Sequence, residues 1–228
     1  MESPPGVSEP FASLDRRRDS LVEAGEWPHA NQKLIQSLVE FELAKSGQSL
    51  GRTVSRQEGT RSRLQTALQG ITRLDKPLDL LQLEDLLGLQ RLLSANRCAS
   101  FRQAPQTPLC TSHFPIRPSQ IRPALRQLFE WVGSQSFAEL HPLQQAALAQ
   151  VRLYEIYPFE TCGECSISIF SYYFLVAGSF LLPSPVVSEM PRFYRALEMA
   201  FGLDTHPLVE LNLKNCWRSY ELIAPVTG

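Results

Sequence analysis

The sequence predicts an all-α fold: a helical domain with a short β-hairpin flap and an N-terminal helical extension. Apolar residues recur at helical spacing over most of the chain after residue 30. Prolines stand just inside the starts of three of these stretches, at Pro142, Pro191 and Pro207, as is typical of helix N-termini. One stretch, 96–118, instead carries four prolines between short apolar pieces, which favours a hairpin or an extended flap.

The composition is that of an ordinary globular protein. The chain has 228 residues, of which 43% are hydrophobic and 20% are charged. A net charge of −1 gives no general basic field, so we expect no nucleic-acid partner. The five cysteines are an odd number and are scattered, unlike a dense disulfide framework. Because the first residues lack the pattern of a secretory signal, we expect a cytoplasmic location.

The first 75 residues are expected to form two segments. Residues 1–30 contain four prolines and two glycines, and are predicted to be a loosely ordered lead-in without core residues. Residues 31–75 are predicted to be a helical extension that begins with an amphipathic helix over 31–46. The arginine-rich stretch 51–63 that follows is interpreted as a solvated connection or a short helix.

The main domain, 76–220, is predicted to begin with a helix over 78–93. Nine of these sixteen residues are leucine, and Asp79 with Gln82 has the spacing of a capping box. After the flap, apolar periodicity predicts five more helices, over 121–132, 142–157, 164–182, 191–201 and 207–217.

The predicted helix 164–182 is apolar enough that a membrane-spanning helix is an alternative to a buried one. No charged residue occurs between Cys165 and Val187. Serines dilute the stretch, however, prolines at 183 and 185 shorten it, and no basic cluster flanks it. A helix that is apolar all round is also typical of the centre of a helical domain, so we expect a buried helix and no membrane association.

Several stretches agree with one known family in residue type and order. His141 to Ala149 reads HPLQQAALA, and Tyr154 to Phe159 reads YEIYPF, ahead of a loop and a long apolar helix. Phe114 to Pro118 reads FPIRP upstream, and FYRAL at 193–197 and HPLVE at 206–210 follow. In this order they resemble the Fic (Fido) family, in which an H-P-x-x-x-A-A helix leads into the signature H-P-F-x-[DE]-G-N-G-R-x-x-R. The resemblance covers about residues 30–215.

The resemblance implies a Fic-type helical domain and an activity. Enzymes of the family transfer AMP, less often another phosphate-containing group, from a nucleotide to a hydroxyl of a target protein. A histidine acts as general base, which suits its near-neutral pKa. An acidic residue holds Mg²⁺, glycines let helix N-terminal amides approach the phosphates, and arginine clamps them. ATP with Mg²⁺ is therefore the expected cofactor if any activity is retained, and none is expected otherwise.

The signature itself is degenerate in its acid, its base and a glycine. Aligned without gaps, Tyr157 stands at the position of the base and Thr161 at that of the acid. A tyrosine with a pKa of about 10 is protonated at neutral pH. Glu164 replaces a glycine, so a side chain and a negative charge oppose an anion at the helix N-terminus. The sequence therefore predicts a dismantled transferase site.

The remaining signature positions support the same prediction. Cys165 and Ser168 replace the two arginines, which removes charge-assisted contacts worth about 1.5–3 kcal/mol each. Pro158 and Phe159, which serve packing and loop shape in the family, are retained. Gly163 is the candidate for a backbone contact with a phosphate, because it lies in the expected cradle and has no side chain.

A segment upstream resembles the inhibitory motif of many Fic proteins, [ST]-x-x-x-E-[GN], whose glutamate pairs with the second signature arginine. Glu58 and Gly59 match this motif, but the residue four before Glu58 is Val54 and the partner position is Ser168. Glu58 is therefore a candidate regulatory residue or, alternatively, an ordinary exposed glutamate in an arginine-rich turn.

The stretch that the family uses to dock its targets corresponds to the predicted flap. Thr111, Phe114, Pro115 and Ile116 are the candidate docking residues. A flap of this kind binds an extended segment of a protein partner by strand addition, which uses main-chain groups and needs no signature residues. The partner expected from the sequence is thus an unidentified protein.

Cys162 and Cys165 form a C-x-x-C motif at a predicted helix N-terminus, where thiol pKa values are lowered. A zinc site would need two more ligands, for which Cys98, Cys110 and His113 are the candidates by type. Two small residues filling a collapsed loop are the simpler interpretation, and no metal is expected.

The sequence therefore leaves three alternative functions open. The first is a catalytically impaired Fic-fold protein, related to protein AMP-transferases, that acts by protein binding. The second is a divergent transferase in which Glu160 or Glu164 serves as metal ligand or base. The third is a redox or metal switch at Cys162 and Cys165.

Overall fold

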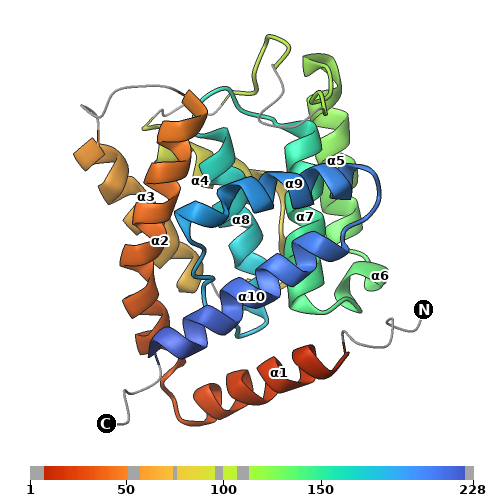
Figure 1. Cartoon of the computed structure of the whole chain (residues 1–228). Coiled ribbons are helices and arrows are strands. Elements are labelled where there is room, and N and C mark those ends of the chain that lie inside the picture. The colour runs from red at the N-terminus through yellow and green to blue at the C-terminus, as the bar shows by residue number, and fades with distance from the viewer. Residues whose placement is uncertain (1–7, 51–56, 74–75, 96–99, 107–112, 224–228) are drawn as a thin grey trace.

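The computed structural model describes residues 8–50, 57–73, 76–95, 100–106 and 113–223 (Figure 1). This part of the chain contains ten α-helices, which confirms the predicted all-α fold class. They are α1 (Ser8–Glu23), α2 (Trp27–Leu50), α3 (Gln57–Thr72), α4 (Leu83–Ser94), α5 (Ile121–Val132), α6 (Gln135–Ala138), α7 (Pro142–Ile156), α8 (Gly163–Ala177), α9 (Met190–Phe201) and α10 (His206–Ile223). The 3₁₀ turns η1 (Leu78–Leu80), η2 (Pro118–Gln120) and η3 (Val187–Glu189) precede α4, α5 and α9.

The predicted β-hairpin flap is not confirmed. Residues 100–106 and 113–117 contain no strand, and Pro105 and Pro115, one in each stretch, have no amide to donate to a regular ladder. Residues 107–112, which would include the tip of the flap and Thr111, lie outside the described residues.

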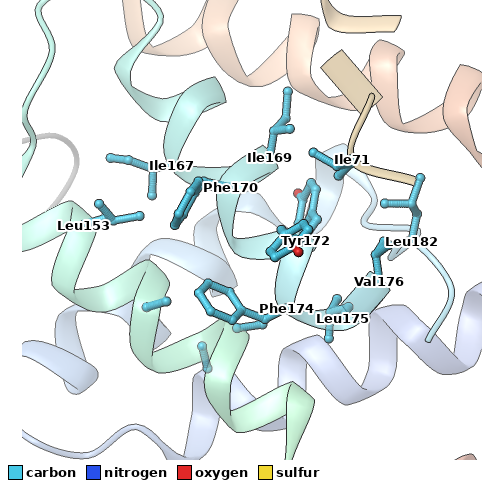
Figure 2. Packing of buried hydrophobic residues seen from close by; sticks show 14 of the residues in the cluster. Ile71, Leu153, Ile167, Ile169, Phe170, Tyr172, Phe174, Leu175, Val176 and Leu182 are labelled. Carbon is cyan, nitrogen blue, oxygen red and sulfur yellow. The ribbon is translucent and has the colours of Figure 1, made fainter. Parts of the chain in front are cut away.

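Helix α8 is the centre of the molecule, and the other helices surround it (Figure 1). Every residue from Gly163 to Val176 is buried, as the absence of charge after Glu164 predicts. Leu153 of α7, Ile71 of α3 and Leu182 pack around its aromatic and aliphatic side chains (Figure 2). Burial of each large apolar side chain stabilises the fold by about 1.5–3 kcal/mol. In the part of the chain that the structure describes, no helix has both the length and the apolar character needed to cross a membrane.

The starts of the later helices follow the prolines of the sequence. At α7, His141 is the N-cap: its Nδ1 accepts a hydrogen bond from the Leu143 amide at 3.2 Å, and its own amide donates to Gln144 Oε1 at 3.1 Å. Pro142 and Pro191 lie in the first turns of α7 and α9. These pairings satisfy N-terminal amides that a helix leaves without partners.

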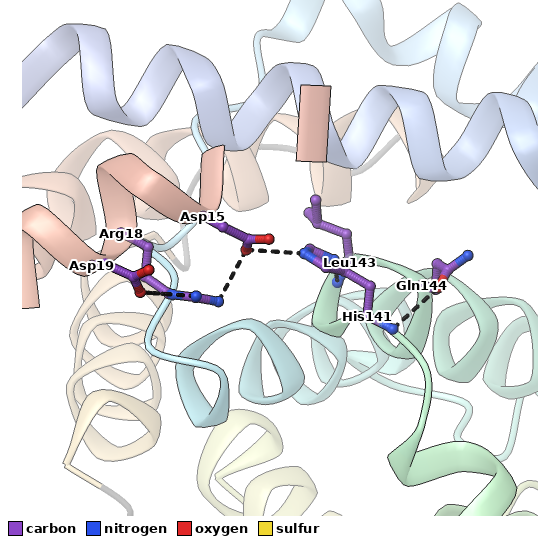
Figure 3. Close-up of polar contacts among 6 residues, drawn as sticks. All are labelled: Asp15, Arg18, Asp19, His141, Leu143 and Gln144. Atoms are coloured by element: carbon purple, nitrogen blue, oxygen red, sulfur yellow. Dashed lines mark hydrogen bonds and ion pairs between the residues drawn. The ribbon is translucent and has the colours of Figure 1, made fainter. Parts of the chain in front are cut away.

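The N-terminal segment differs from the expected loosely ordered lead-in, because residues 8–23 form α1. Phe11 and Leu14 of this helix are buried, so the segment contributes to the core. Phe11 stacks on His141 with ring centroids 4.5 Å apart, and Asp15 Oδ1 lies 3.2 Å from His141 Nε2 (Figure 3). Arg18 pairs with Asp15 at 3.0 Å. Long-range contacts thus stabilise a helix that its local composition does not predict. The division of the chain at residues 30 and 75 stays a prediction.

Helix α3 also exceeds its prediction, since a connection or short helix was expected over 51–63. It extends to Thr72 because Leu64, Ala67, Leu68 and Ile71 are buried at helical spacing. Residues 51–56 lie outside the described residues.

Two predicted helix ends are wrong by about one turn. Residues 78–80 form η1, and α4 begins about one turn later than predicted. Its capping pair is Gln82 with Asp85, whose Oδ2 accepts a hydrogen bond from the Gln82 amide at 2.8 Å, in place of the predicted Asp79–Gln82 pair. Helix α8 ends at Ala177, because the chain turns at Gly178 and at Ser179, which has φ +60°. Residues 180–182 continue as buried chain outside any helix.

Candidate functional site

The candidate site is the turn between α7 and α8, which contains the degenerate signature at residues 157–168. Tyr157, which ends α7, has φ +42°, and Cys162, the N-cap of α8, has φ +53°. The left-handed conformation at Cys162 occurs at a signature position that is glycine in the family, the residue that adopts it without steric cost. The backbone turn is therefore formed here by a residue with a side chain.

The side chain of Tyr157 is folded back onto the N-terminus of α8. Its ring lies so close to Gly163 that a Cβ atom there would be 3.2 Å from Tyr157 Cζ. Tyr157 is 6% exposed, and burial, followed by the nearby Glu164 carboxylate, raises the pKa of its hydroxyl above its usual value. The hydroxyl therefore keeps its proton at neutral pH. Gly163, the expected phosphate contact, lies beneath this ring.

Glu164 lies buried in the first turn of α8, at the place where the resemblance implies phosphate. It is 5% exposed, and Tyr194 of α9 donates a hydrogen bond to its Oε2 at 3.0 Å. Its charge contributes to raising the pKa of the buried Tyr154 hydroxyl, although burial is the larger cause. A carboxylate near the first amides of a helix is favourable, so Glu164 stabilises the N-terminus of α8.

A lysine from α2 reaches the second arginine position of the signature. Lys45 Nζ donates to Ser168 Oγ and lies 3.7 Å from Glu42 Oε2, with both Lys45 and Glu42 buried. Tyr172 donates to Glu42 Oε1 at 3.0 Å. Although burial opposes its charge, the carboxylates of Glu42 and Glu164 raise the pKa of Lys45 above its usual value. The ammonium is thus committed to internal groups.

Helix α4 holds the loop from a second side. Gln90 Nε2 donates to the Thr161 carbonyl at 2.7 Å, and Ser166 Oγ donates to Gln90 Oε1. Thr161 itself is exposed, and its backbone rather than its hydroxyl makes this contact. Gln90 therefore fixes the loop at the position where the family has its Mg²⁺-binding acid.

Arg102 holds the loop from a third side. Its buried guanidinium donates to the carbonyls of Tyr157 at 2.7 Å, Ala104 at 3.0 Å and Ile156 at 3.2 Å, and also to that of Ile116. Its amide donates to the Pro158 carbonyl at 2.9 Å. A cation near the last carbonyls of α7 also interacts favourably with the helix dipole. Pro158 and Phe159, the retained signature residues, are buried beside this contact.

The cysteine pair lies at the start of α8, where Cys162 is the N-cap. Burial raises the pKa of Cys162, whereas the helix N-terminus was expected to lower it. Cys165 is buried, and both cysteines are free thiols. Among the described residues no group of three or more metal-ligating side chains occurs, and Cys98 and Cys110 lie outside them. His113 stacks on Phe201, 4.1 Å between ring centroids, far along the chain from the pair.

The structure places the flap and regulatory candidates as follows. Phe114 is 70% exposed, and Pro115 and Ile116 are half-buried. The Ile116 amide donates to the Glu155 carbonyl at 3.0 Å, so this segment is attached to the end of α7. Glu58 and Gly59 belong to the first turn of α3, and the contacts of the Glu58 side chain lie outside what is described.

Sequence reasoning missed the residues that close the site from distant segments. Glu42 and Lys45 fall on the apolar stripe of the 31–46 helix, four and seven positions after Leu38, and this placement is a signal of buried charge. Gln90 and Arg102 carry no comparable signal, because their partners are backbone groups far along the chain.

Solved structures share this arrangement of helices. A Fic domain containing signaling protein from Bacteroides thetaiotaomicron superposes with a TM-score of 0.76 and 15% identity, over 93% of this chain and 95% of that one. Fic-1 from C. elegans gives a TM-score of 0.72 and 18% identity, over 94% and 71%. A Fic family protein from Desulfovibrio desulfuricans gives 0.68 and 14%, over 97% and 76%. No family model matches the sequence. The chain therefore has the fold of the Fic-domain proteins.

Proposed function

We propose that this protein is a Fic-fold pseudoenzyme, which does not transfer AMP and instead acts by binding a protein partner. One observation carries the proposal: the buried side chains of Tyr157 and Glu164 occupy the N-terminus of α8, where the family's chemistry needs an open anion site. Neither ATP nor Mg²⁺ is a cofactor under this proposal.

Electrostatics supports the loss of nucleotide binding. A phosphate brought to the α8 N-terminus would meet the Glu164 carboxylate, and like charges repel strongly in a water-poor interior. The one buried lysine near the signature, Lys45, is held between Glu42 and Ser168. Cys165 and Ser168 supply no positive charge at the arginine positions. Transfer would also lack a base, because the Tyr157 hydroxyl keeps its proton.

The retained parts support a binding role. The signature loop is fixed by Gln90, Arg102 and Lys45, so the scaffold stays rigid without ligand. The neighbouring segment exposes the Phe114 ring while Ile116 anchors it to α7. A rigid scaffold that presents an exposed aromatic residue suits recognition of a protein segment.

The proposal is tested with the full chain and two nucleotide assays. Calorimetric titration with ATP and Mg²⁺ is expected to give no saturable binding, and ATP labelled on the α-phosphate is expected to leave no label on lysate proteins. Glu164→Gln and its exposed neighbour Glu160→Gln are measured in parallel. The Gln variants preserve side-chain size and remove charge, so they report on recruitment of either carboxylate to chemistry.

Label transfer by the wild-type chain would overturn the proposal. If Glu164→Gln then abolished that transfer while Glu160→Gln retained it, the divergent transferase would be established with Glu164 in its site. Saturable micromolar ATP binding without transfer would also contradict the proposed loss of the nucleotide site.

A further inference from the structure

A narrow pocket lies where α2, α7 and α8 meet α10 and the segment that leads into α9 (Figure 1). Its walls are mostly apolar and include Phe41, Tyr172, Phe193 and Leu211. The exposed Val186 lies at its rim. The centre of a water molecule can reach about 30 Å³ of this pocket, which is room for about two or three atoms of that size. The pocket therefore admits one small chemical group.

The side chain of Gln150 lines this pocket, and it forms no hydrogen bond with any described residue. It is 4% exposed, and its Oε1 is buried without a donor. Gln145 on the same helix is equally buried, but its Nε2 donates to the Phe137 carbonyl at 2.9 Å. Because a buried amide without partners destabilises a fold, the position of Gln150 in a pocket points to a ligand that supplies the partner.

The charges that line the pocket are already paired, which favours a neutral ligand. Within the part of the chain that the structure describes, Lys45 and Glu189 are the charged lining residues. Lys45 lies 3.7 Å from the Glu42 carboxylate, and Glu189 pairs with Lys214 and Arg218. A charged ligand would bring an uncompensated charge into this buried space, which is unfavourable.

A carboxamide has the groups that Gln150 lacks. The Gln150 amide presents an acceptor oxygen and N–H donors in one plane, and a second carboxamide presents the same groups, so the two can pair by two hydrogen bonds. A carboxylate has no proton to donate and cannot form this pair. Asn215, which also lines the pocket and is buried, accepts from Arg218 at its Oδ1, so its Nδ2 is left to donate to the ligand oxygen.

We propose that this pocket binds the carboxamide group of a neutral ligand, which pairs with Gln150 while its apolar body packs against Phe41 and Phe193. The three non-hydrogen atoms of a carboxamide match the size of the pocket. The group is that of a free primary amide or of a glutamine side chain in a partner. The inference does not depend on the proposed protein-binding function, because a free amide is a sufficient ligand.

The test uses the full chain labelled with ¹⁵N, because NMR then reports the side-chain NH₂ groups of Gln150 and Asn215 directly. The probes are butyramide, butyrate and butylammonium, which share an apolar body and differ in the end group. Butyramide is expected to shift the Gln150 resonances in a saturable manner, and the two ions are expected to leave them unchanged at the same concentration.

Two peptides distinguish the sources of the carboxamide. They are acetyl-Ala-Gln-Ala-N-methylamide and its counterpart with glutamate in place of glutamine. Tighter binding of the glutamine peptide than of butyramide would assign the pocket to a partner side chain, and the reverse would assign it to a free amide. Either result supports carboxamide recognition, provided that the glutamate peptide does not bind.

Variants test the role of Gln150. Gln150→Met keeps the length of the side chain and removes its hydrogen bonds, so butyramide binding, now followed at Asn215, is expected to weaken at least tenfold. Gln127→Met, at an exposed position of α5, is the matched control and is expected to bind as the wild type does. Val186→Trp at the rim is expected to block entry without unfolding the protein, since Val186 is exposed.

Stability separates a ligand-binding glutamine from a structural one. The melting temperature of Gln150→Met is expected to equal or exceed that of the wild type, because no hydrogen bond within the described protein is lost. A clear loss of stability in this variant would overturn the proposal. So would the absence of a saturable shift with butyramide and with the glutamine peptide, or equal binding of butyrate and butyramide. None of these results bears on partner binding at Phe114.

Discussion

Arg102 shows how a single residue preserves the signature loop without any of the signature chemistry. Its guanidinium is buried, and its partners are four carbonyl oxygens rather than a carboxylate. These carbonyls belong to the end of α7, to residue 104 and to the segment that anchors the flap. One side chain therefore joins three segments, and burial lowers its pKa.

We predict that Arg102→Ala destabilises the protein by about 3 kcal/mol, because several buried carbonyls lose their donors at once. Arg102→Lys recovers part of this loss, since an ammonium does not reproduce the planar set of donors. Urea unfolding measures both. Arg122→Ala is the control. Arg122 is exposed and lies over the ring of Phe101, the residue before Arg102, so its removal is expected to change the free energy of unfolding only slightly. Equal effects at both arginines would contradict the structural role of Arg102.

His141 predicts a pH dependence of stability. Its Nδ1 accepts the Leu143 amide, so the neutral ring carries its proton on Nε2, toward Asp15 (Figure 3). Burial lowers the pKa of His141, and Arg18 adds to this, while Asp15 opposes it. The folded protein therefore binds the proton less well than the unfolded chain, so stability falls as the pH drops below about 6.5.

The check is the free energy of urea unfolding at several pH values between 7 and 5. His141→Asn keeps a side chain that caps helices but does not titrate, so its stability is expected to fall less steeply with acidification than that of the wild type. His206→Asn, at the exposed start of α10, is expected to retain the wild-type slope. A His141→Asn slope identical to the wild type would refute the assignment.

At the scale of elements, periodicity predicted those helices whose signals are local. Helix α7 begins at a His-Pro cap and carries its apolar residues throughout, and it was predicted within one residue. Helix α1 was missed because it is rich in arginine and its stabilising partners, His141 among them, lie far along the chain. The apolar run after α8 was assigned to the helix because periodicity does not distinguish a buried helix from other buried segments.

The same limit applies to the candidate site. The sequence predicted that Tyr157 and Glu164 stand at the wrong positions for catalysis, because those residues can be aligned on a motif. It did not predict that Lys45 and Arg102 fix the loop, since long-range pairing leaves no local pattern.

Gly178 tests how closely α7 and α8 approach each other. A Cβ at this position would lie 2.5 Å from Pro142 Cγ, so Gly178→Ala forces the end of α8 away from the start of α7. We expect destabilisation of about 1–3 kcal/mol. Gly88→Ala is the matched substitution inside α4, where no atom lies within 4 Å, and it is expected to stabilise by about 0.5–1 kcal/mol. Thermal unfolding compares the two variants. If both were destabilised, the close approach of Gly178 to Pro142 would not explain the loss of stability.

For the whole molecule, a buried charged cluster connects the N-terminal helices to the central helix. Glu42 and Lys45 belong to α2, and Ser168 and Tyr172 to α8. Burial raises the pKa of Glu42, while the Lys45 ammonium and the Tyr172 hydroxyl oppose this rise. The contacts of Lys45 with Ser168 and of Glu42 with Tyr172 join α2 to α8.

We therefore predict strong coupling between Glu42 and Lys45. Lys45→Met leaves buried carboxylates without their cation and is expected to cost about 3–5 kcal/mol. Adding Glu42→Gln to Lys45→Met is expected to restore part of the loss, giving a coupling energy of about 1–3 kcal/mol in a double-mutant cycle by urea unfolding. The cycle at Glu40 and Arg61, which pair on the surface between α2 and α3, serves as the comparison. Solvent screens that pair, so its coupling is expected to be far weaker. If the two cycles gave equal values, burial would not strengthen the pairing of Glu42 with Lys45.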